Sequence, residues 1–400
     1  MTDLAVSRTG TTAAPSAAIA ARATRLRVTT DGLAMAGLAV LAGVLYLVNL
    51  TVSGYGNTYY SMAAQAASQS WSALFFGALD ANGFITLDKP PLATALMGLS
   101  VRVFGLSSWS VLLPEALAGV GTVLVLFLAV RRSFGSRAAL LAGGIMALTP
   151  VAVLIFRYDN PDALLTFLLV TAAWALGRGL ERGAIRWAAL AAFLVGLGFL
   201  TKYLQAWMVL PAFALVWLVA APGSLRRRVA GLAVSAIAVA ASSLWWVAIV
   251  ELLPAASRPS IGGSATNSAL ELLLGYDGLG RIFGNNPGGS GLSSGLDGRA
   301  FGGANAQGGP GGAFGGDPGV LRLFNDVFGG QIAWLLPAAL LSIVAAVAIH
   351  RQTSRTDRRV GGYLLWSAWL LVHVAVFSFM SGIIHPYYSV ILAPAIAALV

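Results

Sequence analysis

The chain has 400 residues, of which 58% are hydrophobic and only 10% are charged, and its formal net charge is +10. Soluble domains contain about 25% charged residues, so this composition excludes a soluble globular protein and indicates that most of the surface faces lipid. Cysteine is absent, which excludes a disulfide framework, a thiolate metal site and a cysteine nucleophile.

The hydropathy pattern predicts about ten membrane-spanning helices, because a bilayer core of roughly 30 Å needs about 20 apolar residues in each helix. The expected fold class is therefore an all-α polytopic membrane protein. Residues 1–33, rich in alanine, threonine and arginine, are expected to form a disordered cytoplasmic tail. The expected spans are residues 34–53, 109–130, 138–156, 162–180, 186–202, 204–221, 229–253, 331–350, 361–380 and 384–400.

The connections between these spans differ in charge from one side of the membrane to the other. With the N-terminus in the cytoplasm, 17 of the 25 lysines and arginines fall on the cytoplasmic side, which has a net charge of +13, against −3 outside. This asymmetry follows the positive-inside rule and argues against a nucleic-acid patch as the origin of the basic excess. The cytoplasmic segments are residues 1–33, 131–137, 178–186, 222–228 and 350–360.

The first outer loop, residues 54–108, contains the earliest candidate site residues. Residues 59–79 have apolar side chains at helical spacing, which predicts a helix lying in the membrane interface. Asp80 follows, and then the sequence Asp88-Lys89-Pro90-Pro91, in which two prolines fix the backbone of the turn. An acid beside a cation close to lipid headgroups suits phosphate binding by Lys89. The alternative is a local ion pair in an interfacial loop.

The link Arg157-Tyr158-Asp159-Asn160-Pro161-Asp162 joins two predicted spans. Asp159 and Asp162 share one face if the next helix begins here. One interpretation is helix capping. Asn160 or Asp159 is then the cap, and Asp162 is a favourable negative charge in the first turn of the helix. Capping accounts less well for Arg157 and Asp159 together, which makes a substrate site the second interpretation.

Two tight outer turns, Thr201-Lys202-Tyr203 and His385-Pro386-Tyr387-Tyr388, each combine a cationic or titratable group with tyrosine. The alternative to a functional role is a lysine that extends toward water and tyrosines of the interface belt. All these outer segments lie on the same predicted side of the membrane. Together they hold the groups needed to bind a phosphate and to remove a proton from a hydroxyl.

Residues 254–330 form the longest outer segment and are dense in glycine. Glycine at this density opposes folding into a core, which favours a low-complexity loop. The functional alternative is a lid that closes over a substrate. The charged and aromatic residues that flank it are candidates for contacting a sugar or phosphate, but spacing does not select among them. These residues are Glu251, Arg258, Glu271, Tyr276, Asp277 and Arg281.

The ordered set of motifs resembles the GT-C glycosyltransferases of the protein O-mannosyltransferase and aminoarabinose transferase type, in the actinobacterial branch of glycosyltransferase family 39. The resemblance covers roughly residues 34–400 and implies the GT-C fold. The motifs that carry it are Asp88-Lys89-Pro90-Pro91-Leu92, Val103-Phe104-Gly105 with Leu113-Pro114, Thr149-Pro150 with Asp159-Asn160-Pro161, Gly198-Phe199-Leu200-Thr201-Lys202, and Tyr387-Tyr388 with Pro394.

The resemblance implies an inverting transfer of a mannose- or arabinose-like sugar from a polyprenyl-phosphate donor, at the outer face of the plasma membrane. The expected acceptor is a hydroxyl of a protein, lipid or cell-wall glycan, and the expected partners include membrane lipids but no nucleic acid. Lys89 matches the lysine that faces the lipid phosphate in relatives, and Arg157 or Lys202 is expected to assist it. The other expected site residues are Asn57, Tyr59, Tyr60, Asp159, Asp162, His385, Tyr387 and Tyr388.

Asn57 is a departure from the family pattern, because relatives carry an acid just after the first span and asparagine cannot act as a general base. We therefore expect Asp80 to be the base, with Asp88 as the second choice. No cluster of metal-ligand spacing is present, although paired carboxylates would tolerate a magnesium or manganese ion.

Two other functions are compatible with the sequence. One is a transporter or flippase for a lipid-linked sugar, and the other is a non-catalytic glycolipid-binding subunit, which Asn57 favours. The nearly uncharged span centres and the absence of an internal repeat argue against a transporter. The expected organisation is a transmembrane core at 34–253, the outer loop 254–330 and further spans at 331–400. Since relatives continue with further spans, we expect more chain to follow Val400.

Overall fold

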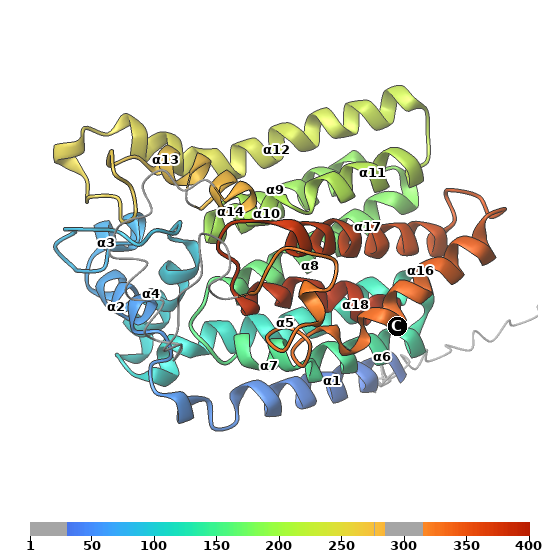
Figure 1. Ribbon diagram of the computed structural model, residues 1–400, viewed down its shortest axis with the longest axis horizontal. Coiled ribbons are helices and arrows are strands. Elements are labelled where there is room, and N and C mark those ends of the chain that lie inside the picture. The colour runs from blue at the N-terminus through green and yellow to red at the C-terminus, as the bar shows by residue number, and fades with distance from the viewer. Residues whose placement is uncertain (1–29, 276, 285–314) are drawn as a thin grey trace, which may run out of the picture.

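The computed structural model describes residues 30–275, 277–284 and 315–400 (Figure 1). Residues 1–29 of the predicted tail and the central part of the predicted lid, 285–314, lie outside the described residues. Residues 30–33, also predicted to be disordered, instead form the first turn of a helix. Within the described ranges the chain is helical, and its only extended pairings are two isolated bridges, Ala78 with Thr86 and Ile85 with Ser260. The second bridge joins the first long loop to the loop that follows residue 253.

Seven helical segments are long and apolar enough to cross a membrane, which confirms the predicted all-α polytopic class. Each coincides with a predicted span. They are α1 (Thr30–Leu47) with η1 (Leu50–Ser53), α5 (Ser108–Phe134), α8 (Asp162–Arg182), α9 (Ile185–Lys202), α12 (Leu225–Leu252), η4 (Ala333–Leu335) with α16 (Leu336–His350), and α17 (Arg358–Phe379).

The other three predicted spans are helices interrupted by proline or by an unusual backbone conformation. Proline lacks the N–H that an uninterrupted helix needs and restricts the residue before it, so Pro150 ends one helix and begins the next. Tyr203 has a φ of 45° and separates α9 from the next short helix, and the break inside the span 204–221 comes just before Pro211. The interrupted spans are α6 (Ser136–Leu148) with α7 (Pro150–Ile155), α10 (Leu204–Trp207) with α11 (Leu210–Ala220), and η5 (Pro386–Leu392) with α18 (Ala393–Leu399).

Short helices gather at one end of the bundle, on the left of Figure 1. The predicted interfacial helix over 59–79 is divided in two, because Ser70 is extended and its side chain accepts a hydrogen bond from Ala73 N as the cap of the next helix. A further helix directly after Pro91 was not predicted. The short helices at this end are α2 (Thr58–Gln69), α3 (Trp71–Phe76), α4 (Leu92–Phe104), η2 (Ala255–Ser257), α13 (Ala269–Leu274) and α14 (Leu279–Phe283). Another short helix, η3 (Arg322–Phe324), precedes η4.

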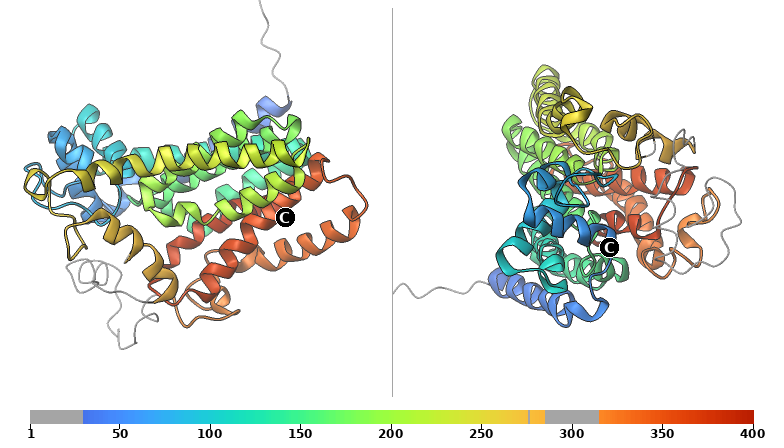
Figure 2. Two further views of the ribbon diagram at one scale, coloured as in Figure 1. Left: turned by 90° about the horizontal axis from the view of Figure 1, so that it is seen from above. Right: turned by 90° about the vertical axis from the view of Figure 1, so that its left-hand side faces the viewer.

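The long helices pack closely because small residues lie where they cross. A Cβ atom on Gly196 of α9 would lie 1.8 Å from Ser242 Oγ of α12, and one on Gly119 of α5 would lie 2.5 Å from the Phe156 side chain. Small residues let backbones approach in a membrane, where lipid is as apolar as leucine and burial supplies little driving force. The views in Figure 2 show these helices running side by side along the long axis.

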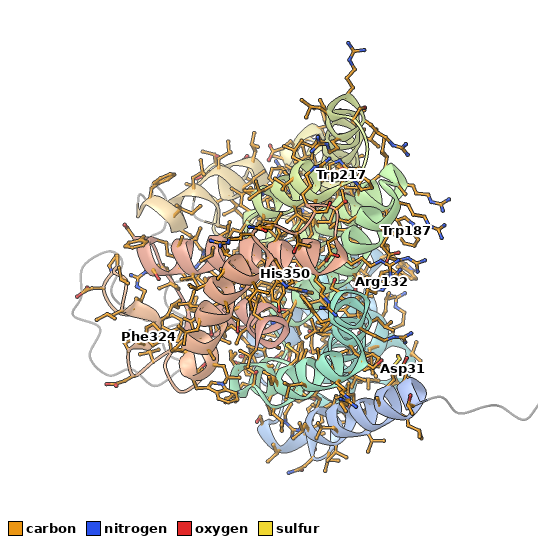
Figure 3. All side chains as sticks on the ribbon, turned by 90° about the vertical axis from the view of Figure 1, so that its right-hand side faces the viewer. Asp31, Arg132, Trp187, Trp217, Phe324 and His350 are labelled. Carbon is orange, nitrogen blue, oxygen red and sulfur yellow. The ribbon has the colours of Figure 1, made fainter. Side chains whose placement is uncertain are left out.

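The two ends of the bundle carry different charges. One end of the bundle, at the right of Figure 1, faces the viewer in Figure 3. At this end Asp31 pairs with Arg131 at 3.1 Å, and Glu181 accepts two hydrogen bonds from Arg132 at 2.9 and 2.7 Å. We call this the arginine end. The opposite end, which carries α2, α3, α4, α13 and α14, is called the site end. Of the predicted cytoplasmic segments, residues 131–137, 178–186, 222–228 and 350–360 lie at the arginine end.

Candidate active site

Lys89 lies at the centre of a buried ion-pair network at the site end. Its ammonium is 2.7 Å from an Asp88 oxygen and 2.8 Å from Asp277 Oδ1, and only 6% of Lys89 is exposed. Asp277 Oδ1 also accepts a bond from Arg281 at 2.8 Å. The lysine therefore joins the first long loop to α14, across 188 residues of sequence.

Local backbone contacts hold both carboxylates beside Lys89. Leu87 N donates to Gly77 O at 2.8 Å, and Asp88 N donates to Tyr59 Oη at 3.1 Å, which fixes the turn before Pro90. On the other side, a Cβ atom on Gly278 would lie 1.8 Å from Leu273 O. The tight turn that places Asp277 therefore requires glycine at position 278.

A second buried ion pair lies next to the first. Lys202, at the end of α9, pairs with Asp162 in the first turn of α8, and Gln205 donates to the other Asp162 oxygen at 3.1 Å. The Lys202 ammonium is 4.0 Å from the centre of the Tyr388 ring, and Arg281 donates to the Tyr388 hydroxyl at 2.7 Å. Tyr388 thus links the two ion pairs.

Lys202→Met should destabilise the protein by about 3–5 kcal/mol, because it leaves the fully buried Asp162 carboxylate without its cation. Thermal unfolding in detergent, monitored by circular dichroism, measures the effect. The Lys202→Met/Asp162→Asn double variant should recover most of the loss. Equal stability of the single and double variants would contradict an ion pair at this position.

The network is electrically neutral and almost closed to solvent. Lys89, Lys202 and Arg281 supply three positive charges, and Asp88, Asp162 and Asp277 supply three negative ones. Asp277 Oδ2 is buried and has no hydrogen-bond partner within the described residues. A cavity adjoins the network, and its lining includes Lys89, Lys202 and Arg281 together with the apolar Met208, Phe377 and Met380.

His385 and its aromatic neighbours close the network on the side of η5. The His385 ring stacks on Tyr387 at 5.0 Å between ring centres and meets the Tyr388 ring edge-on at 5.4 Å. Burial, together with the nearby Arg281 and Lys202 charges, holds the pKa of His385 well below its usual range. The imidazole is therefore neutral at physiological pH and adds no fourth positive charge.

Asp159 and Asn57 form a separate contact beside the network. Asn57 caps α2 by accepting a bond from Tyr59 N at 3.0 Å, while its own N–H donates to Asp159 Oδ1 at 2.5 Å. Ser61 Oγ donates to the other Asp159 oxygen at 2.6 Å. Gly56 has a φ of 70°, and a Cβ atom there would lie 2.2 Å from Asp159 Oδ1, so only glycine fits. Asp159 thus anchors the start of α2.

Burial raises the pKa of the Asp159 carboxyl from its ordinary value of 3.8 to about 7. Between these two values the folded protein binds a proton that the unfolded chain has lost, so the stability contributed by this group falls as the pH rises toward 7. We expect the wild type to lose more thermal stability between pH 5 and pH 8 than Asp159→Asn does. Parallel pH profiles of the two proteins would contradict the raised pKa.

Two expected site residues have other partners. Asp80 accepts hydrogen bonds from Asn82 N and Phe84 N, both at 2.9 Å, so its carboxylate closes a local turn. Among the described residues it makes no hydrogen bond to the ion-pair network. Arg157 donates to three carbonyls, that of Leu45 in the last turn of α1 and those of Val48 and Asn49 just beyond it, at 2.7–2.9 Å. These bonds give the Arg157 guanidinium a capping role at the end of a helix, and its binding of phosphate stays a prediction.

Arg157→Ala should therefore lower stability by about 2–3 kcal/mol, since hydrogen bonds from a charged donor contribute about 1.5–3 kcal/mol and three carbonyls lose theirs. The midpoint of thermal unfolding measures this loss, and Arg226→Ala, at the arginine end, is the control for removal of one arginine. If Arg157→Ala has the same unfolding midpoint as the wild type, the hydrogen bonds from Arg157 to the end of α1 do not contribute to stability.

Several members of the site escaped sequence analysis because their partners are distant along the chain. Asp277 and Arg281 were two of six open candidates, and nothing in the spacing distinguished them. Of the others, Glu251, Arg258 and Glu271 bond instead to the segment between Ser264 and Leu270, and Tyr276 lies outside the described residues. Ser61 and Gln205 gave no sequence signal at all. Tyr60 packs beside Tyr59, with ring centres 5.5 Å apart.

A metal site is not evident in the part of the chain that the structure describes. No three histidine, aspartate or glutamate side chains converge there as a ligand set. The carboxylates of the network are instead placed around cations of the protein itself.

Comparisons with known proteins agree with this architecture. Residues 88–246 match the family described as dolichyl-phosphate-mannose-protein mannosyltransferase. A Bacillus subtilis protein named "Putative mannosyltransferase YkcB" is 38% identical over 426 residues, an alignment that covers 89% of this chain and 59% of that protein. The chain thus spans about three fifths of the length of the curated relatives it matches.

Two solved structures share the fold. ArnT from Cupriavidus metallidurans, bound to undecaprenyl phosphate, superposes with a TM-score of 0.62 and 19% identity, covering 93% of this chain and 60% of ArnT. The oligosaccharyltransferase AglB from Archaeoglobus fulgidus, in complex with an inhibitory peptide and a dolichol-phosphate, gives a TM-score of 0.57 and 14% identity, covering 92% and 50%. At these identities the similarity establishes the fold alone.

Proposed function

Because this chain is a multi-pass membrane protein with the GT-C fold and is related to mannosyltransferases, we propose that it transfers a mannose-like sugar from a polyprenyl phosphate to a hydroxyl. The observation that carries the proposal is the buried ion-pair network beside a cavity that both cationic and apolar side chains line. Three fixed cations suit an anionic phosphate, and the apolar residues suit an isoprenoid chain.

The donor phosphate binds by exchange with the protein's own carboxylates. In the structure each cation of the network is paired with an aspartate, so a phosphate that reaches Lys89 takes the place of Asp88 or Asp277. Charge-assisted bonds from lysine and arginine then hold the phosphate oxygens. Displacement from Lys89 leaves the Asp88 carboxylate able to accept a proton, which makes Asp88 the proposed general base.

The chemical step follows from this arrangement. The acceptor oxygen attacks the anomeric carbon from the side opposite the phosphate, the bond from that carbon to the phosphate oxygen breaks, and the configuration inverts. The hydroxyl proton passes to Asp88, and the electron pair of the broken bond remains on the polyprenyl phosphate. Lys89 and its neighbouring cations stabilise the charge that develops on this leaving group, in a site with little access for water.

The charge of the two ends supports an orientation for the site. The arginine end carries the basic loops, and basic loops remain in the cytoplasm. The site end then faces outward from the plasma membrane. The ligands in two proteins of the same fold agree with the donor class, since ArnT was solved with undecaprenyl phosphate and AglB with a dolichol-phosphate.

The test is sugar release by the purified full chain in nanodiscs that contain radiolabelled polyprenyl-phosphate mannose. We expect label to leave the lipid phase and to appear in water or on an added membrane acceptor. Label that crosses the bilayer of proteoliposomes while still attached to lipid would indicate a flippase instead. Binding without release, for every donor sugar tried, would indicate a glycolipid-binding subunit.

A further inference from the structure

A groove of about 270 Å³ lies between α9, α11 and α12. Small side chains line much of it, among them Ala191 of α9, Ala214 of α11 and Ala236 of α12, and we call it the α12 groove. Elsewhere small residues let helices approach closely, as Gly196 and Ser242 do where α9 crosses α12. In the α12 groove the same kind of residue leaves a space between the helices, and Ala236 at its edge is exposed.

The α12 groove has the depth of one membrane leaflet. At the arginine end the indole N–H of Trp217, a lining residue, donates to Arg228 O at 2.9 Å and joins α11 to α12. The deepest lining residue on α12 is Val239, eleven residues beyond Arg228 and therefore about 16 Å further into the bundle. Half of a hydrocarbon core of roughly 30 Å is about 15 Å. One acyl chain of a lipid thus matches the groove in depth.

Exposed arginines gather at the end of the α12 groove that lies nearest the arginine end. The turns 182–186 and 222–228 are in contact there, since a Cβ atom on Gly183 would lie 2.7 Å from Pro222 O. We call their exposed arginines the arginine cluster. Its members are Arg182, Arg186, Arg226 and Arg227.

The protein supplies no negative charge to the arginine cluster within these two turns, which contain no acidic residue. The adjacent Glu181 already accepts two hydrogen bonds from Arg132, and the salt bridges of the described residues include no member of the cluster. Arg226 and Arg227 also lie in the first turn of α12, where the helix dipole favours a negative charge. An anion beside this turn would therefore be favoured by the arginines and by the dipole together.

We infer that the α12 groove binds an anionic phospholipid of the leaflet at the arginine end. One acyl chain lies along the alanines of the groove, and the headgroup phosphate accepts hydrogen bonds from the arginine cluster, whose guanidinium groups suit phosphate oxygens. A zwitterionic headgroup carries an ammonium that the same arginines repel, so a headgroup with a net negative charge binds more tightly. This site lies at the opposite end of the bundle from Lys89 and does not depend on the proposed function.

Native mass spectrometry of the purified full chain in detergent tests the site without any need for activity. Phosphatidylglycerol and phosphatidylcholine with identical acyl chains are added in separate titrations. We expect one phosphatidylglycerol per chain to be retained at a concentration roughly tenfold lower than phosphatidylcholine requires. Equal retention of the two lipids would overturn the inference, and so would a lipid-free dimer, which would indicate that a second copy of the chain fills the groove.

The headgroup contact is tested by Arg186→Gln/Arg227→Gln, which removes one exposed arginine from each turn. We expect the affinity for phosphatidylglycerol to fall roughly tenfold, to about that for phosphatidylcholine. Arg137→Gln/Arg351→Gln removes two exposed arginines of the same end outside the cluster and should bind lipid like the wild type. An equal loss in both double variants would mean that overall charge attracts the lipid, and it would overturn a defined site.

The acyl-chain contact is tested by Ala236→Phe, which fills the α12 groove from its exposed edge. Phosphatidylglycerol should raise the midpoint of thermal unfolding of the wild type, because a ligand that binds the folded state stabilises it. We expect this rise to disappear in Ala236→Phe and to persist in Ala241→Phe, at an exposed alanine of the same helix outside the lining. The midpoint without lipid shows whether each variant is folded. A full rise in Ala236→Phe would overturn the place of the acyl chain in the groove.

Discussion

Replacing Lys89 by methionine should abolish sugar transfer, with kcat/KM falling by at least roughly 10²–10³-fold. Methionine keeps the length and apolar stem of lysine but removes the charge that stabilises the leaving phosphate. In the structure the Lys89 ammonium lies between two aspartates, 2.7 and 2.8 Å from their oxygens. No other cation of the described residues takes this position between the two carboxylates. Initial rates of label release from the lipid donor, over a range of donor mole fractions, measure the loss.

Stability must be separated from catalysis in this variant. Lys89→Met leaves Asp88 and Asp277 buried without a shared cation, which costs about 3–5 kcal/mol. The Lys89→Met/Asp277→Asn double variant removes one of these charges and should recover much of the thermal stability without recovering activity. A double variant that transfers sugar at the wild-type rate would show that Lys89 serves folding and not the donor.

Asp88→Asn should lower kcat by about 10²–10⁴-fold, the usual contribution of a positioned general base. Asparagine has the shape of aspartate but cannot accept the hydroxyl proton. Because it also cannot form the charged contact with Lys89, donor binding should be measured separately, by quenching of protein fluorescence with a brominated lipid phosphate. The expected result is a loss in kcat that exceeds any change in KM.

Asp80→Asn is the matched control, since it makes the same change in the same loop. Its carboxylate closes a local turn, and loss of one such bond costs about 1 kcal/mol of stability. Activity should stay within a few-fold of the wild type. The opposite pattern, an inactive Asp80→Asn beside an active Asp88→Asn, would return the role of base to Asp80, as expected from sequence.

The spans were predictable because helix length and hydropathy are local properties that a bilayer enforces. The breaks at Pro150 and in the span that follows Tyr203 left the pattern of apolar residues intact, so the spans were found even where the helices are interrupted. Helix α4 was missed because its exposed side is as apolar as its buried side, and a short helix of this kind has no clear polar face. The separation of α2 from α3 depends on the extended backbone of Ser70, which composition does not reveal.

The site was predictable only in part. The Asp88-Lys89-Pro90-Pro91 motif drew attention to the right turn, and the ion pair suggested there as the alternative is present. The partners Asp277 and Arg281 could not be identified, because they follow Lys89 by 188 positions or more and the sequence around them has no distinguishing pattern. Arg157 was assigned to phosphate because an arginine near acids suggests a ligand, and nothing in the sequence indicates that it donates to three backbone carbonyls at and after the end of α1.

The neutrality of the ion-pair network also bears on how substrate arrives. Six buried charges that cancel produce almost no electric field at a distance, so the resting site does not attract phosphates from the surrounding water. A donor confined to the bilayer needs no such attraction, because it reaches the cavity by lateral diffusion. Turnover should consequently follow the surface density of the donor in the membrane and change little with ionic strength. Dissolved nucleotides and inorganic phosphate, however abundant, would then be poor competitors.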